Sequence, residues 1–229
     1  GVKTWNATLA FSIGRYDMSV VHHPDEALLL DYAAGVAGEA ESLVVATHVA
    51  LCPKCRDDQS IMEMVGGSFL SGMEPAAMGQ GALNAALARL DGVETVKPST
   101  AVAGDVPAPL RRFIGTDLGR VRWRPVTRGL SYRILMSRGR SRVYLTKSKP
   151  GSGIGLHTHH GNELTLVLSG GFTDEMGSYT VGDLVHTTPE VNHTPIADDD
   201  GDCITLAMTD APLRFRNIGA GLVARIFGF

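Results

Sequence analysis

The residues best suited to chemistry in this 229-residue chain lie close together near position 50. His48, Cys52 and Cys55 belong to the stretch Thr-His-Val-Ala-Leu-Cys-Pro-Lys-Cys. In a helix, His48 and Cys52 share one face, because residues four apart are neighbours on the helix surface. Pro53 ends that helix and favours the start of another, so that Cys55 turns back toward Cys52. Imidazole and thiolate donors in this arrangement predict a tetrahedral zinc site that needs one further ligand.

His23 is our candidate for the fourth ligand, since it precedes Pro24 at the head of an earlier predicted helix. The adjacent His22 is an alternative ligand. Two other interpretations of Cys52 and Cys55 stay open at this point, a redox dithiol and a pair of idle buried cysteines. A Cys-x2-Cys pair with a helical histidine four residues upstream favours the metal.

A second group of metal-binding residue types lies in the C-terminal half of the chain. His157 and His159 are two apart, so in a strand their side chains point to the same face. Glu163 enters from the following predicted strand, and His193 comes from a loop-rich stretch further on. Three imidazoles and one carboxylate directed into a barrel predict a site for Zn, Fe, Mn, Ni or Cu.

Helices must position the first group. Apolar residues spaced three and four apart predict four helices, over residues 24–36, 39–51, 53–65 and 80–90. Gly66 and Gly67 are expected to end the third helix. We predict that the first three helices form a small bundle held together by the metal, and that the fourth packs against them or against a partner.

Strands must position the second group, because the periodicity changes beyond residue 110. Short runs of alternating apolar residues, such as Leu164, Leu166 and Leu168, are separated by glycine-rich turns. This pattern predicts a barrel or a double-sheet jelly roll. The proline-containing stretch between the two patterns has no period and indicates a linker. The predicted fold class is therefore multidomain α and β, with an extension over 1–17 that we expect to be disordered, an all-α domain over 18–90, a linker over 91–109 and an all-β domain over 110–229.

The charge distribution and the number of cysteines limit the classes of protein to which the chain can belong. Residues 18–90 carry nine acidic and three basic groups, a net charge of −6, although the whole chain carries −3. Nucleic-acid binding draws on Lys and Arg, so this balance disfavours a DNA-binding zinc module and favours a basic protein partner. Only three cysteines occur, which fits a reducing cytoplasm better than a disulfide framework. No apolar run approaches membrane-spanning length, so we expect a cytoplasmic protein without membrane or direct nucleic-acid contact.

The spacing of the second group carries a resemblance to a known family. The stretch from Gly151 to Gly170 resembles the first motif of the cupin superfamily, and that from Gly182 to His193 resembles the second. Three positions depart from the family pattern, since Pro189 stands one place late, Glu190 stands where glycine is usual, and Ala197 stands where asparagine often follows. These departures lie in a turn and leave the four ligand positions intact.

The first group resembles the zinc anti-sigma motif, with His23 ahead of His48, Cys52 and Cys55. Joined to a cupin, it is similar to the ChrR anti-sigma factors of proteobacteria over roughly residues 18–229. The resemblance implies that a zinc-bound helical domain holds a group IV (extracytoplasmic-function) sigma factor away from RNA polymerase. It also implies release by singlet oxygen or related oxidants, with the cupin and its metal (Zn, Fe, Mn or Ni) needed for that release.

An enzyme is the leading alternative, because cupins with three His and one Glu can leave a metal position open to substrate, as in oxygenases and isomerases. The motif shows no separate acid–base pair, which favours a barrel without catalytic activity. His160 and His186 lie near the motif and are weaker candidate ligands. Cys203 is interpreted as a small buried strand residue rather than as a thiol sensor.

Overall fold

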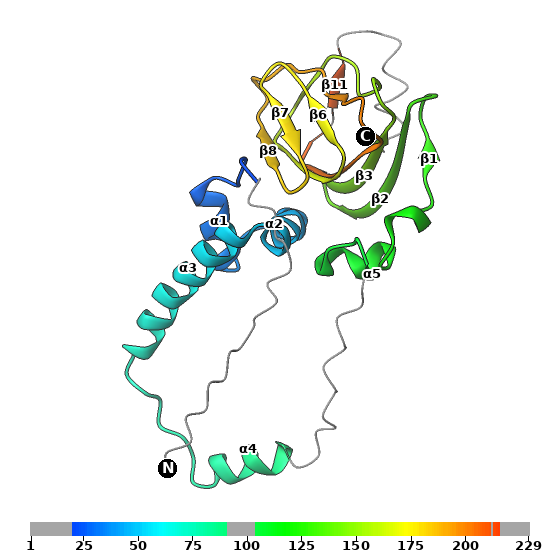
Figure 1. Cartoon of the computed structure of the whole chain (residues 1–229). Helices are drawn as coiled ribbons and strands as arrows, with labels where there is room; N and C mark the ends of the chain where they lie inside the picture. The colour runs from blue at the N-terminus through cyan, green and yellow to red at the C-terminus, as the bar shows by residue number, and fades with distance from the viewer. Residues whose placement is uncertain (1–19, 91–103, 212, 216–229) are drawn as a thin grey trace, which may run out of the picture.

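The computed structural model describes residues 20–90, 104–211 and 213–215. The predicted extension over 1–17 and most of the predicted linker, 91–103, lie outside the described residues. Helices come first and β-structure second (Figure 1), which confirms the predicted fold class. Among the described helices, none has the length and apolar character that a membrane crossing requires.

The N-terminal module is built from helices that begin at recognisable caps. The Asp25 side chain accepts the Leu28 N–H at 2.8 Å before the first helix, and the Glu41 side chain accepts the Gly38 N–H at 2.9 Å at the start of the second. The four helices are α1 (Glu26–Ala33), α2 (Glu39–Leu51), α3 (Pro53–Ser71) and α4 (Ala82–Leu90). The predicted boundaries of α2 are confirmed, and Pro53 occupies the first turn of α3 as the sequence indicated.

The prediction that Gly66 and Gly67 end α3 is wrong, because the helix continues to Ser71. A glycine inside a helix costs only about 1 kcal/mol relative to alanine, and neither glycine has the positive φ that turns a chain out of a helix. The helix ends instead at Gly72, whose N–H reaches back to the Ser68 carbonyl at 3.1 Å.

The barrel combines one large antiparallel sheet with two small ones. The large sheet has the order β1-β2-β3-β10-β5-β8, and the small sheets have the orders β7-β6-β9 and β11-β4. Their bounds are β1 (Arg124–Pro125), β2 (Leu130–Arg138), β3 (Ser141–Ser148), β4 (His157–His159), β5 (Glu163–Ser169), β6 (Gly171–Thr173), β7 (Ser178–Thr180), β8 (Leu184–Thr187), β9 (Ile196–Ala197), β10 (Cys203–Thr209) and β11 (Leu213–Phe215). Short antiparallel strands wrapped in this way confirm the predicted barrel.

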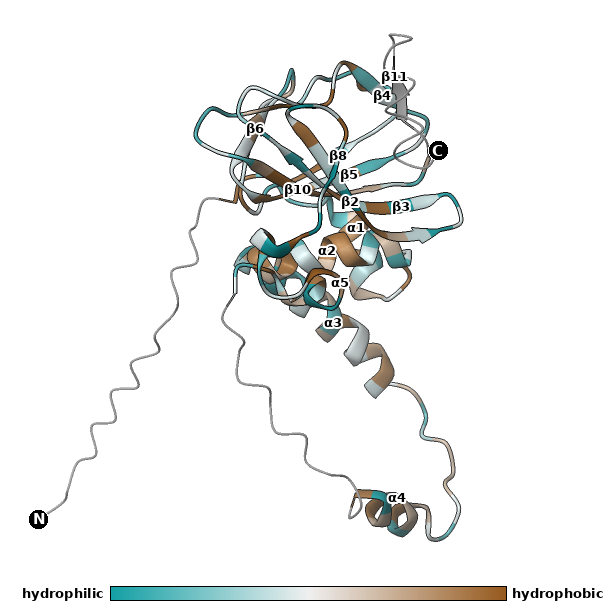
Figure 2. Cartoon of the chain, turned by 90° about the vertical axis from the view of Figure 1, so that its right-hand side faces the viewer, coloured by the Kyte–Doolittle hydropathy of each residue, from teal (hydrophilic) through white to brown (hydrophobic). Residues whose placement is uncertain are grey.

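Helix α2 packs on the outer face of the large sheet (Figures 1 and 2). Leu43 and Val44 are buried in the same apolar cluster as Leu166 of β5 and Leu206 of β10. Alternation along the strands explains this packing, since the leucines face the helix while neighbouring residues such as Thr205 face the barrel interior. The helical module and the barrel therefore share one core, which we call the shared core.

The end of the predicted linker also contributes to the shared core. Val106 and Leu110 are fully buried there. Leu110 closes the short helix η1 (Ala108–Leu110), which packs beside α2. Two further short helices, α5 (Arg111–Ile114) and η2 (Leu118–Arg120), lead from there into the barrel. Val106 and η1 thus pack against α2, whereas Gly104, Asp105 and Ala108 are exposed.

The second half of α3 and all of α4 extend away from the rest of the molecule in both views (Figures 1 and 2). No residue of α4 is buried among the residues that the structure describes. Phe69 of α3 is 74% exposed, and Leu83 and Leu90 of α4 are 69% and 65% exposed. Large apolar side chains in such positions mark a surface that suits a partner.

Candidate metal centres

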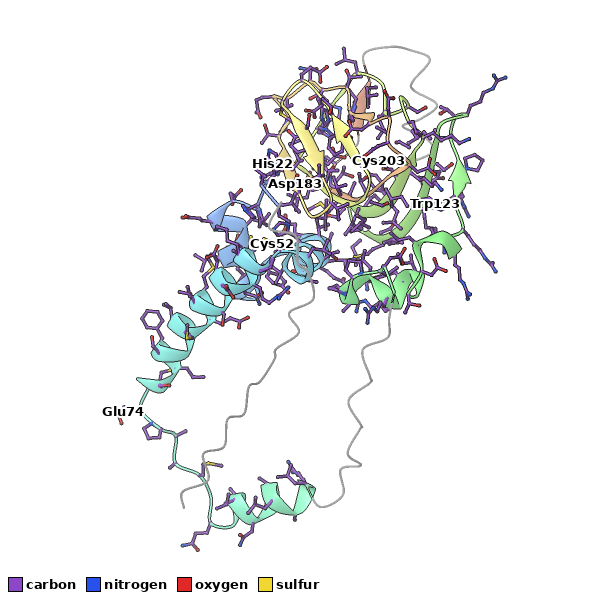
Figure 3. All side chains as sticks on the ribbon, viewed as in Figure 1. His22, Cys52, Glu74, Trp123, Asp183 and Cys203 are labelled. Carbon is purple, nitrogen blue, oxygen red and sulfur yellow. The ribbon has the colours of Figure 1, made fainter. Side chains whose placement is uncertain are left out.

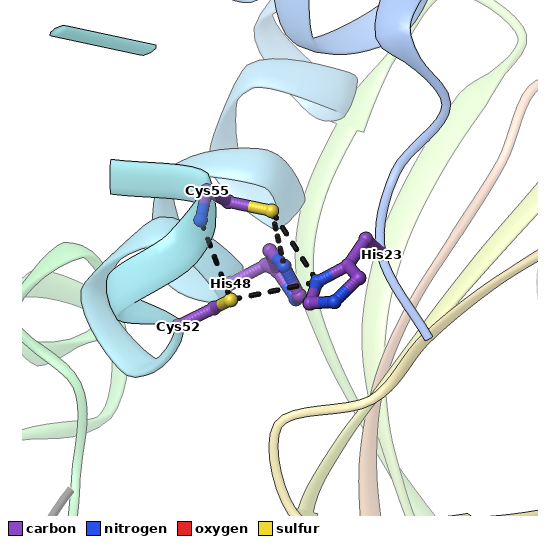
Figure 4. Close-up of side chains that lie close together, drawn as sticks. All are labelled: His23, His48, Cys52 and Cys55. Carbon is purple, nitrogen blue, oxygen red and sulfur yellow. Dashed lines mark hydrogen bonds between the residues drawn. The ribbon is translucent and has the colours of Figure 1, made fainter. Parts of the chain in front are cut away.

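The first candidate centre brings together His23, His48, Cys52 and Cys55, as the sequence predicted (Figure 4). His48 comes from α2, Cys52 from the α2–α3 junction, Cys55 from the first turn of α3, and His23 from the segment before α1. His23 Nδ1 lies 3.5 Å from Cys52 Sγ and 3.4 Å from Cys55 Sγ, and His48 Nε2 lies 3.2 Å from Cys55 Sγ. All four donor atoms lie within 4.8 Å of one another.

These distances suit the edges of a tetrahedron around one ion. Zn–N and Zn–S bond lengths place neighbouring ligand atoms about 3.3–3.8 Å apart in a tetrahedral site. Burial lowers the pKa of His48 to about 4, so its imidazole is neutral at pH 7, which is the form that binds metals. The donor set therefore fits a structural zinc ion.

The electrostatics argue against the redox dithiol. Burial and the neighbouring Cys52 raise the pKa of the Cys55 thiol to about 12, whereas reactive dithiols carry a lowered pKa. Both cysteines are buried and unbridged by a disulfide. A dication bound between the two sulfurs would stabilise the thiolates that burial otherwise disfavours.

His22, the alternative ligand, points to the barrel instead. Its Nδ1 lies 3.5 Å from Asp183 Oδ2, and its ring packs edge-on against Tyr179 with the ring centroids 4.7 Å apart. Figure 3 labels His22 and Asp183 where the segment before α1 meets the barrel, with Cys52 in the helices nearby. Of the two adjacent histidines, it is His23 that the structure brings to the cysteines.

The second candidate centre lies inside the barrel. His157 and His159 on β4, Glu163 at the start of β5 and His193 in the loop before β9 are all buried, and their donor atoms gather within 4.8 Å of one another. His159 Nε2 lies 3.3 Å from His193 Nε2 and 3.4 Å from Glu163 Oε2. The antiparallel bridge between His157 and His193 holds the loop against β4.

Neighbouring groups within the barrel orient this second set. The Gly155 carbonyl accepts from His157 Nδ1 at 2.9 Å, Asp174 Oδ2 pairs with His193 Nδ1 at 2.9 Å, and the Tyr144 hydroxyl donates to Glu163 Oε1 at 3.0 Å. Carboxylate and carbonyl partners of this kind fix the tautomer of a metal-binding histidine.

Burial lowers the pKa of His157 and of His159 to about 4, so both rings are neutral at pH 7. Neutral imidazoles and one carboxylate fit a divalent transition metal.

A cavity of about 40 Å³ adjoins the second centre. Glu163, His157 and His193 line it together with Cys203, whose pKa burial raises to about 12. A water molecule needs roughly 10–15 Å³ of such space, so the cavity admits only very small molecules. Cys203 is a buried strand residue, as expected.

The two weaker candidate ligands lie outside both centres. His160 is exposed. His186 pairs with Asp25 at the start of α1, with its Nδ1 3.4 Å from Asp25 Oδ2. The sequence missed three orienting groups, Tyr144, Asp174 and Asp183, because each acts on a residue far along the chain and no local spacing marks it.

A helical module with a two-histidine, two-cysteine cluster, packed on a barrel with a three-histidine, one-glutamate cluster, defines a two-part protein of the cupin class. Residues 112–211 match the family model described as the ChrR Cupin-like domain. The anti-sigma-E factor ChrR of Cereibacter sphaeroides is 42% identical over 212 residues, covering 92% of this chain and 99% of the relative. The chain belongs to the ChrR anti-sigma factor family.

A solved structure extends the likeness to three dimensions. The crystal structure of Rhodobacter sphaeroides SigE in complex with the anti-sigma ChrR matches with a TM-score of 0.74 and 39% identity. The match covers 83% of this chain and 99% of that chain. The similarity therefore spans both the helical module and the barrel.

Proposed function

We propose that this chain is an anti-sigma factor that sequesters a group IV (extracytoplasmic-function) sigma factor and releases it under singlet oxygen or related oxidative stress. Membership of the ChrR family supports the inhibitory role, as does the complex of its relative with SigE. The observation in this structure that carries the proposal is the apolar surface left uncovered on α3 and α4.

That surface has the periodicity of a partner-binding helix. Leu83, Leu87 and Leu90 recur at four- and three-residue spacing along α4, and each is at least half exposed. The second half of α3 adds Phe69 and Leu70, which are 74% and 72% exposed. An amphipathic helix with an uncovered stripe lays that stripe into a groove of its partner.

Charge supports a sigma factor as the occupant. The net charge of −6 over residues 18–90 complements a protein with basic surfaces for DNA and apolar surfaces for RNA polymerase. In this proposal 18–90 is the inhibitory unit, 91–109 connects it to the barrel, and 110–229 is the sensing and release unit. Because its partner acts on RNA polymerase, the protein works in the cytoplasm and needs no direct contact with nucleic acid.

The two centres have different roles in this proposal. His23, His48, Cys52 and Cys55 hold Zn²⁺, which stabilises the fold of the helical module. His157, His159, Glu163 and His193 hold Zn²⁺ or another divalent transition metal such as Fe, Mn or Ni, and this metal takes part in the response to oxidants. The barrel residues fix the tautomers and exclude bulk water from that centre.

The test begins with the partner. The chain is used to pull down proteins from its own cells, and the sigma factor identified by its peptides is purified for transcription in vitro. We expect the chain to stop transcription that depends on this sigma factor. Leu83→Asp combined with Leu87→Asp should restore transcription, while Asn84→Asp combined with Ala85→Asp on the same helix adds equal charge outside the leucine stripe and should leave inhibition intact. Full inhibition by the leucine variant would contradict the proposed surface.

The second candidate function is a cupin metalloenzyme, oxygenase or isomerase-like, with an accessory zinc module. The cavity beside the barrel centre is the observation that favours it. The cavity is small, at about 40 Å³, so we propose a barrel that senses rather than catalyses. Turnover of an organic substrate by the metal-loaded protein would contradict the sensing role and favour the metalloenzyme.

A further inference from the structure

The turn of the barrel between β7 and β8 contacts the first metal centre. His48 Nδ1 lies 2.9 Å from the carbonyl oxygen of Gly182. A carbonyl can only accept, so Nδ1 carries the proton and donates it, and Nε2 presents its lone pair toward Cys55 Sγ at 3.2 Å. A group of the barrel therefore selects the tautomer in which His48 can bind a metal through Nε2.

The same turn holds the segment that carries the other histidine. Asp183 is 2% exposed, and its Oδ1 accepts the backbone N–H groups of Val21 and His22 at 2.8 and 2.9 Å. The N–H of Leu184 donates to the His22 carbonyl at 3.0 Å. His23 is the next residue, so the backbone that positions it is tied to the barrel by three hydrogen bonds.

A hydrogen bond across the turn and the conformation of Gly182 make the turn rigid. Asp183 Oδ2 accepts the Thr180 N–H at 2.9 Å across the turn. Gly182 has a φ of +94°, which side chains rarely tolerate, and a Cβ added there would lie 2.6 Å from Cγ2 of Val20. The turn and the segment before α1 therefore fit closely.

Strand β8 connects this turn to the second centre. It begins next to Asp183 and ends at Thr187, which pairs with Glu163 and lines the cavity beside the barrel centre. A change at Glu163 can thus reach the turn along a four-residue strand.

We infer that the 180–184 turn is an outer shell of the first metal centre, with Asp183 and the Gly182 carbonyl as positioning groups that set how firmly His23 and His48 hold the metal. The two cysteines belong to the α2–α3 junction itself, so the barrel controls the two nitrogen ligands and not the two sulfurs. This inference rests on the proposed occupation of the centre by a metal, and it makes the barrel a regulator of metal retention in the helical module.

The test uses the intact protein loaded with Co²⁺. Cobalt bound to thiolate gives a sulfur-to-metal charge-transfer band, which reports the first centre alone because the second centre contains no sulfur. Release is started with excess chelator and followed by the decay of this band. We expect Asp183→Asn to release the metal about tenfold faster or more, since outer-shell substitutions change metal affinity by that order.

Two controls separate positioning from general destabilisation. Asp202→Asn removes a different barrel carboxylate, whose Oδ2 lies 2.8 Å from Lys147 Nζ. This variant should release cobalt at the wild-type rate. Cobalt retention in the barrel should be unchanged in Asp183→Asn. If that variant also loses the barrel metal, Gly182→Ala is compared with it, because this variant alters the backbone that carries the carbonyl and keeps the Asp183 carboxylate.

Wild-type release rates in both Asp183→Asn and Gly182→Ala would overturn the inference and leave the proposed function standing. Absence of the charge-transfer band in the wild-type protein is a different failure, because it would remove the metal assignment itself and this inference with it.

Discussion

The two metal centres differ in how local their construction is. The barrel centre draws its ligands, and the Gly155, Asp174 and Tyr144 groups that orient them, from the barrel alone. The helical centre takes its ligands from the segment before α1, from α2, from the α2–α3 junction and from α3, and the orientation of His48 depends on the barrel carbonyl of Gly182. The barrel centre is thus self-contained, whereas the helical centre depends on the barrel for part of its support.

The donor atoms of the two centres also differ. Sulfur ligands are softer and more easily oxidised than the nitrogen and oxygen ligands of the barrel. Cys55 of the helical centre lies in the first turn of α3, whose second half carries part of the proposed sigma-binding surface, whereas the barrel centre lies inside the barrel. Holding and sensing are therefore expected to separate when each centre is removed in turn.

The largest effect is expected from removing a sulfur ligand. Cys52→Ser or Cys55→Ser should abolish the helical metal, lower helicity and end sigma binding, because a structural zinc can supply on the order of 10 kcal/mol to a small domain. Metal analysis should fall from about two ions per chain to about one, with the barrel ion retained. Unchanged metal content and folding in both variants would rule out the four-ligand assignment.

Removal of a ligand from the barrel centre should leave the helical module intact. His157→Ala or Glu163→Gln removes one buried ligand of the barrel centre, so the barrel ion should be lost while the cobalt–thiolate band of the helical centre persists. Sigma binding should be retained, because the uncovered leucines lie on α4. Metal analysis and a binding assay on the same sample check this, and loss of both ions from either variant would contradict the separation.

An intermediate effect is expected at the shared core. Leu43→Ala removes a buried side chain between α2 and the sheet and should lower the free energy of unfolding by about 2–5 kcal/mol. Leu30→Ala makes the same change at a position that is 52% exposed and serves as the control. Denaturant unfolding followed by circular dichroism measures both. Equal, small effects would show that the helix and the sheet do not share a core.

The helical module without the barrel provides a further test of how far the two parts depend on each other. Residues 18–90 alone should inhibit sigma-dependent transcription, because both the acidic charge and the α3–α4 surface lie there. The fragment should be less stable than the intact chain, since it exposes Ala40, Leu43 and Val44. Transcription in vitro provides the measurement, and inhibition by the intact protein alone would make the barrel part of the inhibitor.

The smallest effect concerns pH. Burial tends to raise the pKa of Asp183, but hydrogen bonds from the N–H groups of Thr180, His22 and Val21 hold it below its ordinary value of 3.8. A carboxyl with a lowered folded-state pKa stabilises fully above its unfolded-state pKa and loses that contribution as the pH falls through the folded value. The stability difference between wild type and Asp183→Asn should stay constant from pH 7 to about pH 5 and shrink below about pH 4. A difference that changes near neutral pH would point to another group.

Both ligand sets were predictable from the sequence because spacing alone nearly defines them. His48 and Cys52 are one helical turn apart, and His157 and His159 share one face of a strand. The choice of His23 over His22 rested on the position of His23 before Pro24 and on the family resemblance. Its structural cause is Asp183, which pairs with His22 and is distant in sequence.

Non-local features escaped prediction. Burial of α2 against the sheet requires the strand order, which places β10 between β3 and β5. The true end of α3 depends on two glycines that keep helical φ values, which no local rule guarantees. The burial of Val106 and Leu110 likewise follows from the position of α2 and not from the composition of residues 104–110.

The central claim is that the helical centre maintains inhibition while the barrel centre reports the oxidant. The most direct measurement uses cells that carry a reporter dependent on the bound sigma factor and produce either wild-type protein or Glu163→Ala. The account predicts that Glu163→Ala keeps the reporter silent before singlet-oxygen treatment and leaves it silent afterwards, while the wild type is released. High activity before treatment would mean that the barrel centre holds the inhibitory fold together, and a normal response afterwards would mean that the barrel metal takes no part in sensing.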